Sequence, residues 1–171
     1  MITSKQTRSF FTALLLSIVF VTTTYADVYK NDDTSVEDNA VGKLQFVNPW
    51  ARPSMSSGKS LNSNSAIFLE IKNNTDQAYS LIGVNAMHTA NNVELHESFI
   101  DEKQIARMRS VDKIVVPARS SIFLKSGGMH IMLFGLKHLL KDGDTFEAEI
   151  IFDGIPPEHI TVKVLSTPPA K

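Results

Sequence analysis

The sequence predicts an all-β domain, an antiparallel β-sandwich or barrel, and three observations lead to this prediction. Apolar and polar residues alternate over many short segments, as they do in strands that bury one face. Turn-forming residues separate these segments at regular intervals. Beyond the N-terminal region, no segment has the apolar period of a long amphipathic helix. Short strands with regular turns are typical of sandwiches and barrels.

The first 26 residues have the layout of a secretory signal peptide. Lys5 and Arg8 form a small basic region, and residues 10–21 are mostly apolar. We predict cleavage after Ala26, because the apolar run is short for the competing interpretation, a membrane anchor. No cysteine follows the segment, so no lipid anchor is expected. Residues 27–42 are polar and acidic and are predicted to be a flexible leader.

The folded domain is predicted to span residues 43–165, with a loose Pro-rich tail at 166–171. Each predicted strand is a run of alternating or β-branched residues bounded by turn formers. The predicted strands are 43–48, 66–72, 79–85, 93–98, 105–111, 113–116, 121–125, the stretch within 126–135, 145–152 and 160–164. The connection 135–143 is predicted to be a loop with one helical turn around Leu139-Leu140.

Two prolines follow the first predicted strand and limit where that part of the chain can lie. Pro49 and Pro53 flank Trp50, and proline cannot donate to a central ladder, so Trp50 is predicted at a bend or on a sheet edge. Residues 54–65 are rich in Ser, Asn and Gly and are predicted to form a loop, with Met55 exposed in it.

The overall composition excludes several classes of function. The chain has 171 residues, which fits one domain, and its 17 basic and 18 acidic side chains give no sign of a nucleic-acid partner. It contains no cysteine, which excludes disulfides, thiolate metal sites and cysteine nucleophiles. No nucleophile motif, phosphate loop or paired-carboxylate pattern is present, so no enzymatic activity is predicted.

The stretch 126–135 carries the most informative pattern of the chain. If it is a strand, His130 and Met132 share one face, because alternate side chains of a strand point the same way. The opposite, core-directed face then carries Met129, Ile131 and Leu133. Gly127 and Gly128 fit a tight turn that leads into the strand.

Four residues are candidate metal ligands: His96, Met108, His130 and Met132. Two imidazoles and two thioethers form a neutral, soft set that favours copper(I) over zinc, calcium or magnesium. A thioether also survives in an oxidising compartment, where a pair of thiols would form a disulfide. A blue-copper electron-transfer site needs a cysteine, so the set indicates that copper is carried.

Each of these four residues, taken alone, also fits an ordinary packing or surface role. The metal hypothesis depends on the shared face of His130 and Met132, together with the position of His96 on the polar face of its own strand. Of the other histidines, His138 and His159 are expected at the surface, and His88 either at the surface or next to the ligands. A metal-free binding module, a copper oxidase and a copper-buffering protein remain open as alternatives.

The chain resembles the periplasmic copper(I) chaperones of the PCuAC type between residues 44 and 164. The matching segments are Asn48-Pro49-Trp50-Ala51-Arg52, Ala66-Ile67-Phe68-Leu69, Glu94-Leu95-His96-Glu97, Met108-Arg109-Ser110-Val111 and 127–137. The family's ligand pattern is a His, a Met about ten residues further on, and then a His-x-Met pair. Here eleven residues separate His96 from Met108, one more than in the family, and twenty-one separate Met108 from His130, as in the family. The longer first gap crosses the turn 100–104, where an insertion is easily absorbed.

This resemblance implies a cupredoxin-like β-sandwich that binds one copper(I) ion through His96, Met108, His130 and Met132. It also implies a periplasmic location, and a partner that is the apo CuA domain of cytochrome c oxidase or another periplasmic copper-site assembly protein. A monomer with no stable membrane insertion after signal cleavage is expected. For a carrier, we expect a site near the surface, on loops and strand ends.

Overall fold

The structure is a computed structural model, and it describes residues 44–54 and 63–170. The predicted signal peptide and leader and the predicted position of Met55 lie outside these ranges. The described strands are β1 (Leu44–Ala51), β2 (Ser65–Asn73), β3 (Tyr79–Asn85), β4 (Ala90–Ile100), β5 (Ala106–Ser110), β6 (Ile114–Val116), β7 (Ser120–Leu124), β8 (Met129–Leu136), β9 (Thr145–Phe152) and β10 (Glu158–Val164). Within these ranges there is no helix, and hence none that could span a membrane.

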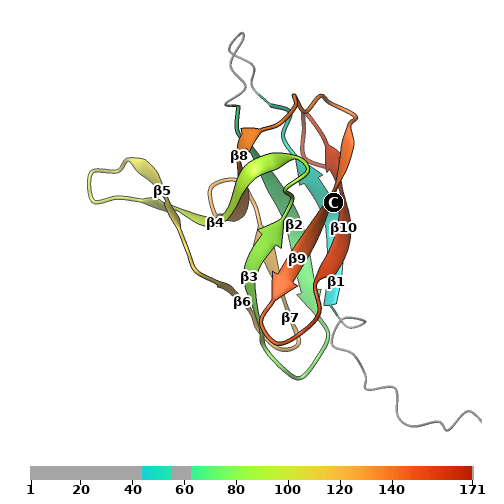
Figure 1. Ribbon diagram of the computed structural model, residues 1–171. Coiled ribbons are helices and arrows are strands. Elements are labelled where there is room, and N and C mark those ends of the chain that lie inside the picture. The colour runs from blue at the N-terminus through green and yellow to red at the C-terminus, as the bar shows by residue number, and fades with distance from the viewer. Residues whose placement is uncertain (1–43, 55–62, 171) are drawn as a thin grey trace, which may run out of the picture. The chain divides into compact units, whose positions relative to one another are not determined.

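The ten strands form one hydrogen-bonded sheet, nine of them in the order β5-β4-β8-β2-β1-β10-β9-β3-β6 (Figure 1). The tenth strand, β7, lies outside this order and pairs with the part of β2 that does not pair with β8. The sheet curls, so that β6 at one end comes close to β2 and β7. The predicted all-β fold is therefore confirmed. One pair, β1 with β10, is parallel, whereas the prediction was wholly antiparallel.

The core lies between the inward faces of the curled sheet. Alternate residues of strands such as β9 and β10 are buried, and Ile131, Leu133, Ile150 and Val162 are fully enclosed. Phe46 and Tyr79 pack against the enclosed Phe152 with ring centroids 6.2 and 6.4 Å away. This core fixes the positions of β4 and β8, whose outer faces are then free to carry polar side chains.

Trp50 lies at a bend, as predicted, but on a strand that is paired on both sides and not on an edge. It is opposite Phe68 of β2 and Lys163 of β10. The register with β2 shifts between Val47 and Trp50, and Asn48 has a φ of 50°, which marks a bulge. A bulge leaves one residue out of the ladder, so the missing N–H of Pro49 is tolerated within a central strand.

The predicted helical turn around Leu139-Leu140 is wrong. The backbone N–H of Leu140 donates to Ser54 Oγ at 3.0 Å, and its carbonyl accepts from the Ser54 N–H at 2.9 Å. Leu140 is also 2% exposed, so its side chain is anchored in the core. Residues 137–140 form a bend and no helical turn, and the two hydrogen bonds with Ser54 hold them in place.

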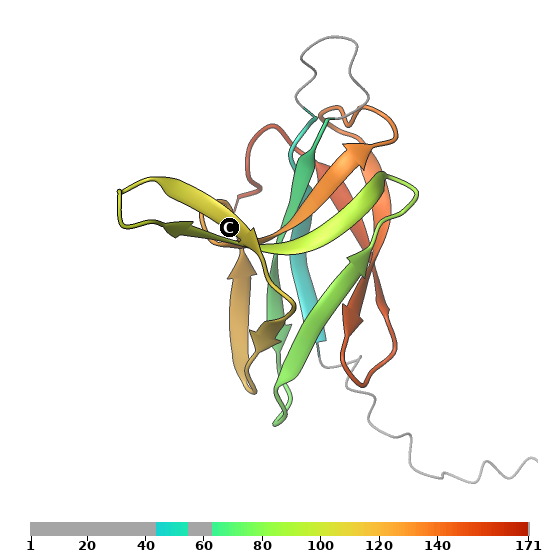
Figure 2. The same cartoon turned by 60° about the vertical axis from the view of Figure 1, so that its left-hand side comes forward.

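The hairpin formed by β4 and β5 extends away from the other strands (Figures 1 and 2). All five residues of β5 are exposed. Its turn is held by Asp101, which accepts hydrogen bonds from the Lys103 and Ile105 N–H groups at 2.9 and 2.8 Å and from Arg107 Nε at 3.0 Å. This hairpin brings Met108 back toward the sheet.

Candidate metal centre

Strand pairing places the four candidate ligands on one face of three adjacent strands. His96 on β4 lies directly opposite His130 on β8, and two residues along the same pair of strands Glu94 lies opposite Met132. On the other side of β4, Ser98 lies opposite Met108 of β5. Residues two apart on a strand share a face, so all these side chains project from the same side of the sheet.

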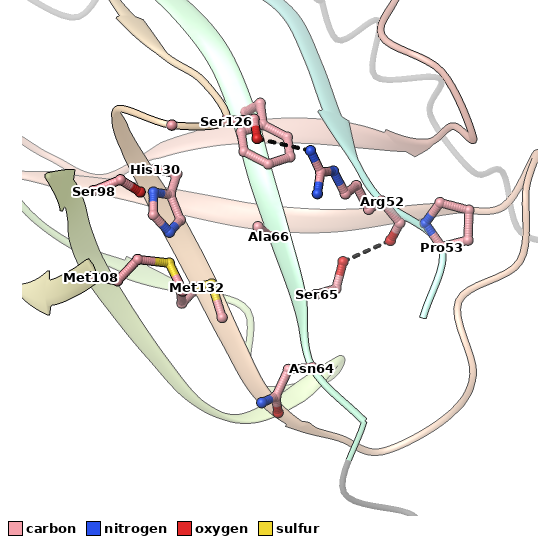
Figure 3. A pocket seen from close by; sticks show the side chains of 12 residues that line it. Arg52, Pro53, Asn64, Ser65, Ala66, Ser98, Met108, Ser126, His130 and Met132 are labelled. Atoms are coloured by element: carbon pink, nitrogen blue, oxygen red, sulfur yellow. Dashed lines mark hydrogen bonds between the residues drawn. The ribbon is translucent and has the colours of Figure 1, made fainter. Parts of the chain in front are cut away.

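A cavity of about 430 Å³ opens on this face and is lined by Met108, His130 and Met132 (Figure 3). Ser98 and Phe68 form part of its wall. Figure 3 shows the side chains of Met108 and Met132 close to the imidazole of His130, with Met108 entering from the hairpin side. A larger cavity of about 620 Å³ elsewhere is lined by neither histidine nor methionine, so it offers no comparable donors.

His130 is 4% exposed, and the hydrogen bond it makes decides which ring nitrogen is free. Its Nδ1 lies 2.9 Å from the Gly128 carbonyl oxygen. A carbonyl only accepts, so Nδ1 carries the proton and Nε2 keeps its lone pair. The turn that supplies this carbonyl has Gly127 at a φ of 78°, as the predicted glycine turn requires.

His96 is held by its other ring nitrogen, Nε2. Its ring centroid lies 5.8 Å from that of His130, and its side chain is 12% exposed. Its Nε2 lies 2.9 Å from Glu94 Oε2, so in the neutral ring Nε2 donates and Nδ1 has the lone pair. That Nδ1 is buried and has no hydrogen-bond partner among the described residues. A buried unsatisfied nitrogen costs about 1–3 kcal/mol, which a bound ligand would recover.

Glu94 itself is held as a carboxylate. Its pKa lies below the usual range, chiefly because it accepts the His96 hydrogen bond and also because it accepts one from Asn92. The Asn92 Nδ2 to Glu94 Oε1 distance is 2.7 Å. Both carboxylate oxygens are therefore engaged, and the group fixes the orientation of the His96 ring.

The two methionines differ in exposure. Met132 is half-buried, whereas Met108 is 60% exposed. In the described part of the chain, no group of three His, Cys, Asp or Glu side chains is placed to hold a metal ion. The donors gathered on this face include two thioether sulfurs, which favour copper(I).

Several residues that contact the candidate ligands were not predicted from the sequence. The ring of Phe68 lies 6.3 Å from His130, and that of Phe134 lies 5.6 Å from His96. Arg52 stands over Phe68 at 5.4 Å and donates to Ser126 Oγ at 2.9 Å. Glu94 could have been found, because it shares the polar face of β4 with His96. The aromatic contacts come from strand pairing over long sequence distances and carry no local signal.

The remaining predicted positions agree with the structure. His88, His138 and His159 are exposed, which confirms the surface assignment, and Met129 is half-buried against the core. Trp50 packs on Phe68 at 4.8 Å, outside the lining of the cavity. The candidate ligands lie within strands, but loop residues such as Asn64 and Gly127, and Ser65 at the start of β2, complete the lining of the cavity, so the expected location on loops and strand ends is met in part.

The fold and the site define a small all-β protein with a soft-donor cavity on one sheet face. The chain belongs to the family described as "Putative lipoprotein LpqE-like", whose model matches residues 44–164. It is 30% identical over 132 residues to the "Uncharacterized protein RP573" of Rickettsia prowazekii (strain Madrid E). The aligned region covers 76% of this chain and 71% of that protein.

Solved structures share the fold. The copper-bound PCuAC domain from PmoF2 is 23% identical with a TM-score of 0.59, and 75% of this chain and 97% of that domain are covered. The apo PCuAC domain from PmoF1 is 22% identical with a TM-score of 0.61, at coverages of 74% and 97%. The solution structure of CuI-DR1885 from Deinococcus radiodurans is 23% identical with a TM-score of 0.55, at coverages of 74% and 84%. The PCuAC resemblance is thus confirmed for the fold.

Proposed function

We propose that this protein binds one copper(I) ion through Nδ1 of His96, Nε2 of His130 and the sulfurs of Met108 and Met132, and carries that ion to another protein. The observation that carries the proposal is the pair of imidazoles, one buried and one largely buried. Each has one nitrogen held by an acceptor and the other free, and two thioethers share the face on which they lie. Copper bound to two of the neighbouring folds supports the same assignment.

The arrangement suits transport better than the alternatives. A metal-free binding module predicts that the four residues are scattered, whereas strand pairing gathers them on one face. An oxidase would need copper to cycle between oxidation states with a substrate. A donor set of two thioethers and two imidazoles favours copper(I) and disfavours such a cycle.

The proposal is tested by anaerobic titration of the purified chain with copper(I) against a colorimetric chelator. We expect one equivalent to bind, and Met132→Leu and His130→Ala to abolish or greatly weaken the binding. His138→Ala, at an exposed histidine outside the cavity, is the matched control. If Met132→Leu and His130→Ala leave copper(I) binding unchanged, the copper-carrier proposal is refuted.

For the destination, we propose the apo CuA domain of cytochrome c oxidase or another periplasmic copper-site assembly protein. The support is the resemblance of the sequence to PCuAC chaperones. Mixing the copper-loaded chain with an apo CuA domain and separating the two proteins measures transfer directly. Retention of the copper by this chain would instead support the runner-up function, copper buffering.

We also propose that the protein acts in the periplasm after cleavage behind Ala26. The support is the basic and apolar pattern of the first 26 residues. N-terminal sequencing of the protein recovered from its compartment tests this, because a mature chain should begin at Asp27.

A further inference from the structure

We propose that Met108 is the ligand that leaves first when copper(I) is handed on, which makes the β4–β5 hairpin the exchange side of the site. This inference rests on the proposed function and gives unequal roles to the two methionines. Met132 is a fixed ligand that holds the ion, and Met108 is a displaceable ligand that admits the receiving protein.

The strands that carry the two methionines differ in how firmly they are held. Met132 lies on β8, which is hydrogen-bonded to β4 on one side and β2 on the other, with Glu94 and Ala66 as its direct neighbours. Met108 lies on β5, the terminal strand of the described sheet, whose neighbour is β4. An edge strand opens locally at a lower free-energy cost than a central one.

The side chains differ in the same direction. Met108 is 60% exposed, whereas Met132 is half-buried in the cavity wall. The two imidazoles are more firmly fixed still, since His130 is 4% exposed and hydrogen-bonded to Gly128 and the His96 ring is hydrogen-bonded to Glu94. Release of Met108 therefore requires only rotation of a flexible side chain into solvent.

The preference for releasing Met108 before Met132 follows from that rotation. An exposed methionine that is released regains most of its rotamer freedom, whereas one confined in a cavity regains little, and this difference corresponds to about a tenfold preference. In the exchange, the bond from Met108 sulfur to copper breaks and a bond from the incoming donor forms. The donor is a thioether, an imidazole or a thiol that has already lost its proton, and copper remains in the +1 state throughout.

The first test compares three variants of the full chain, Met108→Leu, Met132→Leu and the control Met87→Leu. Met87 is 49% exposed and is outside the cavity, so its variant should match the unaltered chain. Affinity and the rate of copper(I) loss to an excess of chelator are measured anaerobically by stopped flow. We expect Met132→Leu to weaken affinity about tenfold more than Met108→Leu does, and Met108→Leu to speed copper loss about tenfold.

The second test observes the two side chains directly. Methyl-labelled methionine in the chain loaded with silver(I), a redox-inert stand-in for copper(I), gives separate NMR signals for Met108 and Met132. We expect exchange broadening at Met108 and a single sharp bound signal at Met132. Equal affinity losses in both variants, or broadening at Met132 alone, would overturn this inference while leaving the copper site intact. Failure of the unaltered chain to take up copper(I) would overturn the proposed function itself.

Discussion

Replacement of Glu94 by Gln tests whether the carboxylate beside His96 controls the proposed copper site. Glu94 Oε2 accepts the His96 Nε2–H at 2.9 Å, which leaves the lone pair of that ring on Nδ1. Gln has the same shape and keeps one acceptor oxygen, but it loses the charge. The hydrogen bond is weakened and the ring becomes less basic and less firmly oriented.

The magnitude follows from the position of the side chain. Loss of a partner that orients a metal-binding histidine costs about 10–100-fold in metal affinity. The Glu94 side chain is 39% exposed, so solvent already screens its charge and the lower end of that range applies. We therefore expect Glu94→Gln to lower copper(I) affinity about tenfold, while the fold is unaffected.

The assay is chelator competition at neutral pH, with Glu97→Gln as the matched control. Glu97 is on the same strand but on the opposite face, where it forms an ion pair with Arg109 at 2.8 Å. Its variant should keep full affinity, because it does not reach the His96 ring. Equal losses in both variants, or full affinity in Glu94→Gln, would refute the argument that this carboxylate orients His96.

Three further predictions concern the frame around the site. Leu133→Ala, at a fully buried position, should lower the free energy of unfolding in urea by about 2–5 kcal/mol. Gly135→Ala should cost at least about 1–2 kcal/mol, because Gly135 has a φ of 62° and a Cβ there would lie 2.9 Å from a neighbouring asparagine amide. Gly128→Ala, with only ordinary contacts, is its control, and equal costs would contradict the argument. The pKa of Asp101 is lowered, mainly by the Ile105 N–H, so its stabilisation of the hairpin is present above an unfolded value of about 3.9 and is lost as the pH falls through the folded value. Protection of the Ile105 amide from hydrogen exchange, corrected for the intrinsic rate, should fall on acidification, and constant protection would contradict this.

The positions of the strands were predictable because each strand buries one face and exposes the other. The ranges 79–85 and 145–152 match β3 and β9 at both ends. The parallel pairing of β1 with β10 was not predictable, since it joins opposite ends of the domain and has no local signal. Trp50 lies at a bend, as predicted, but the central pairing of its strand was not expected, because proline was treated as excluded from central strands, whereas a bulge accommodates it.

The candidate site was predictable in part for the same reason. Alternation places His130 and Met132 on one face, and the structure agrees. The position of Met108 depends on the register of the hairpin, which the Asp101 turn sets and which a one-residue slip would reverse. Alternation also does not predict how deeply a side chain is buried. His130 lies on the outer face of its strand yet is 4% exposed, because side chains such as Phe68 cover it.

Charge explains why such a site would favour a monovalent ion. The four proposed donors are neutral, so a bound copper(I) ion adds one positive charge to a largely buried place, where an isolated charge is costly. The Glu94 carboxylate is hydrogen-bonded to His96 and is not one of the proposed ligands, and its one negative charge would balance the charge of the ion. A divalent ion would leave one charge uncompensated and would also gain little from the thioethers. Selectivity in this family member would then come from the donor atoms and from a single carboxylate placed behind one of them.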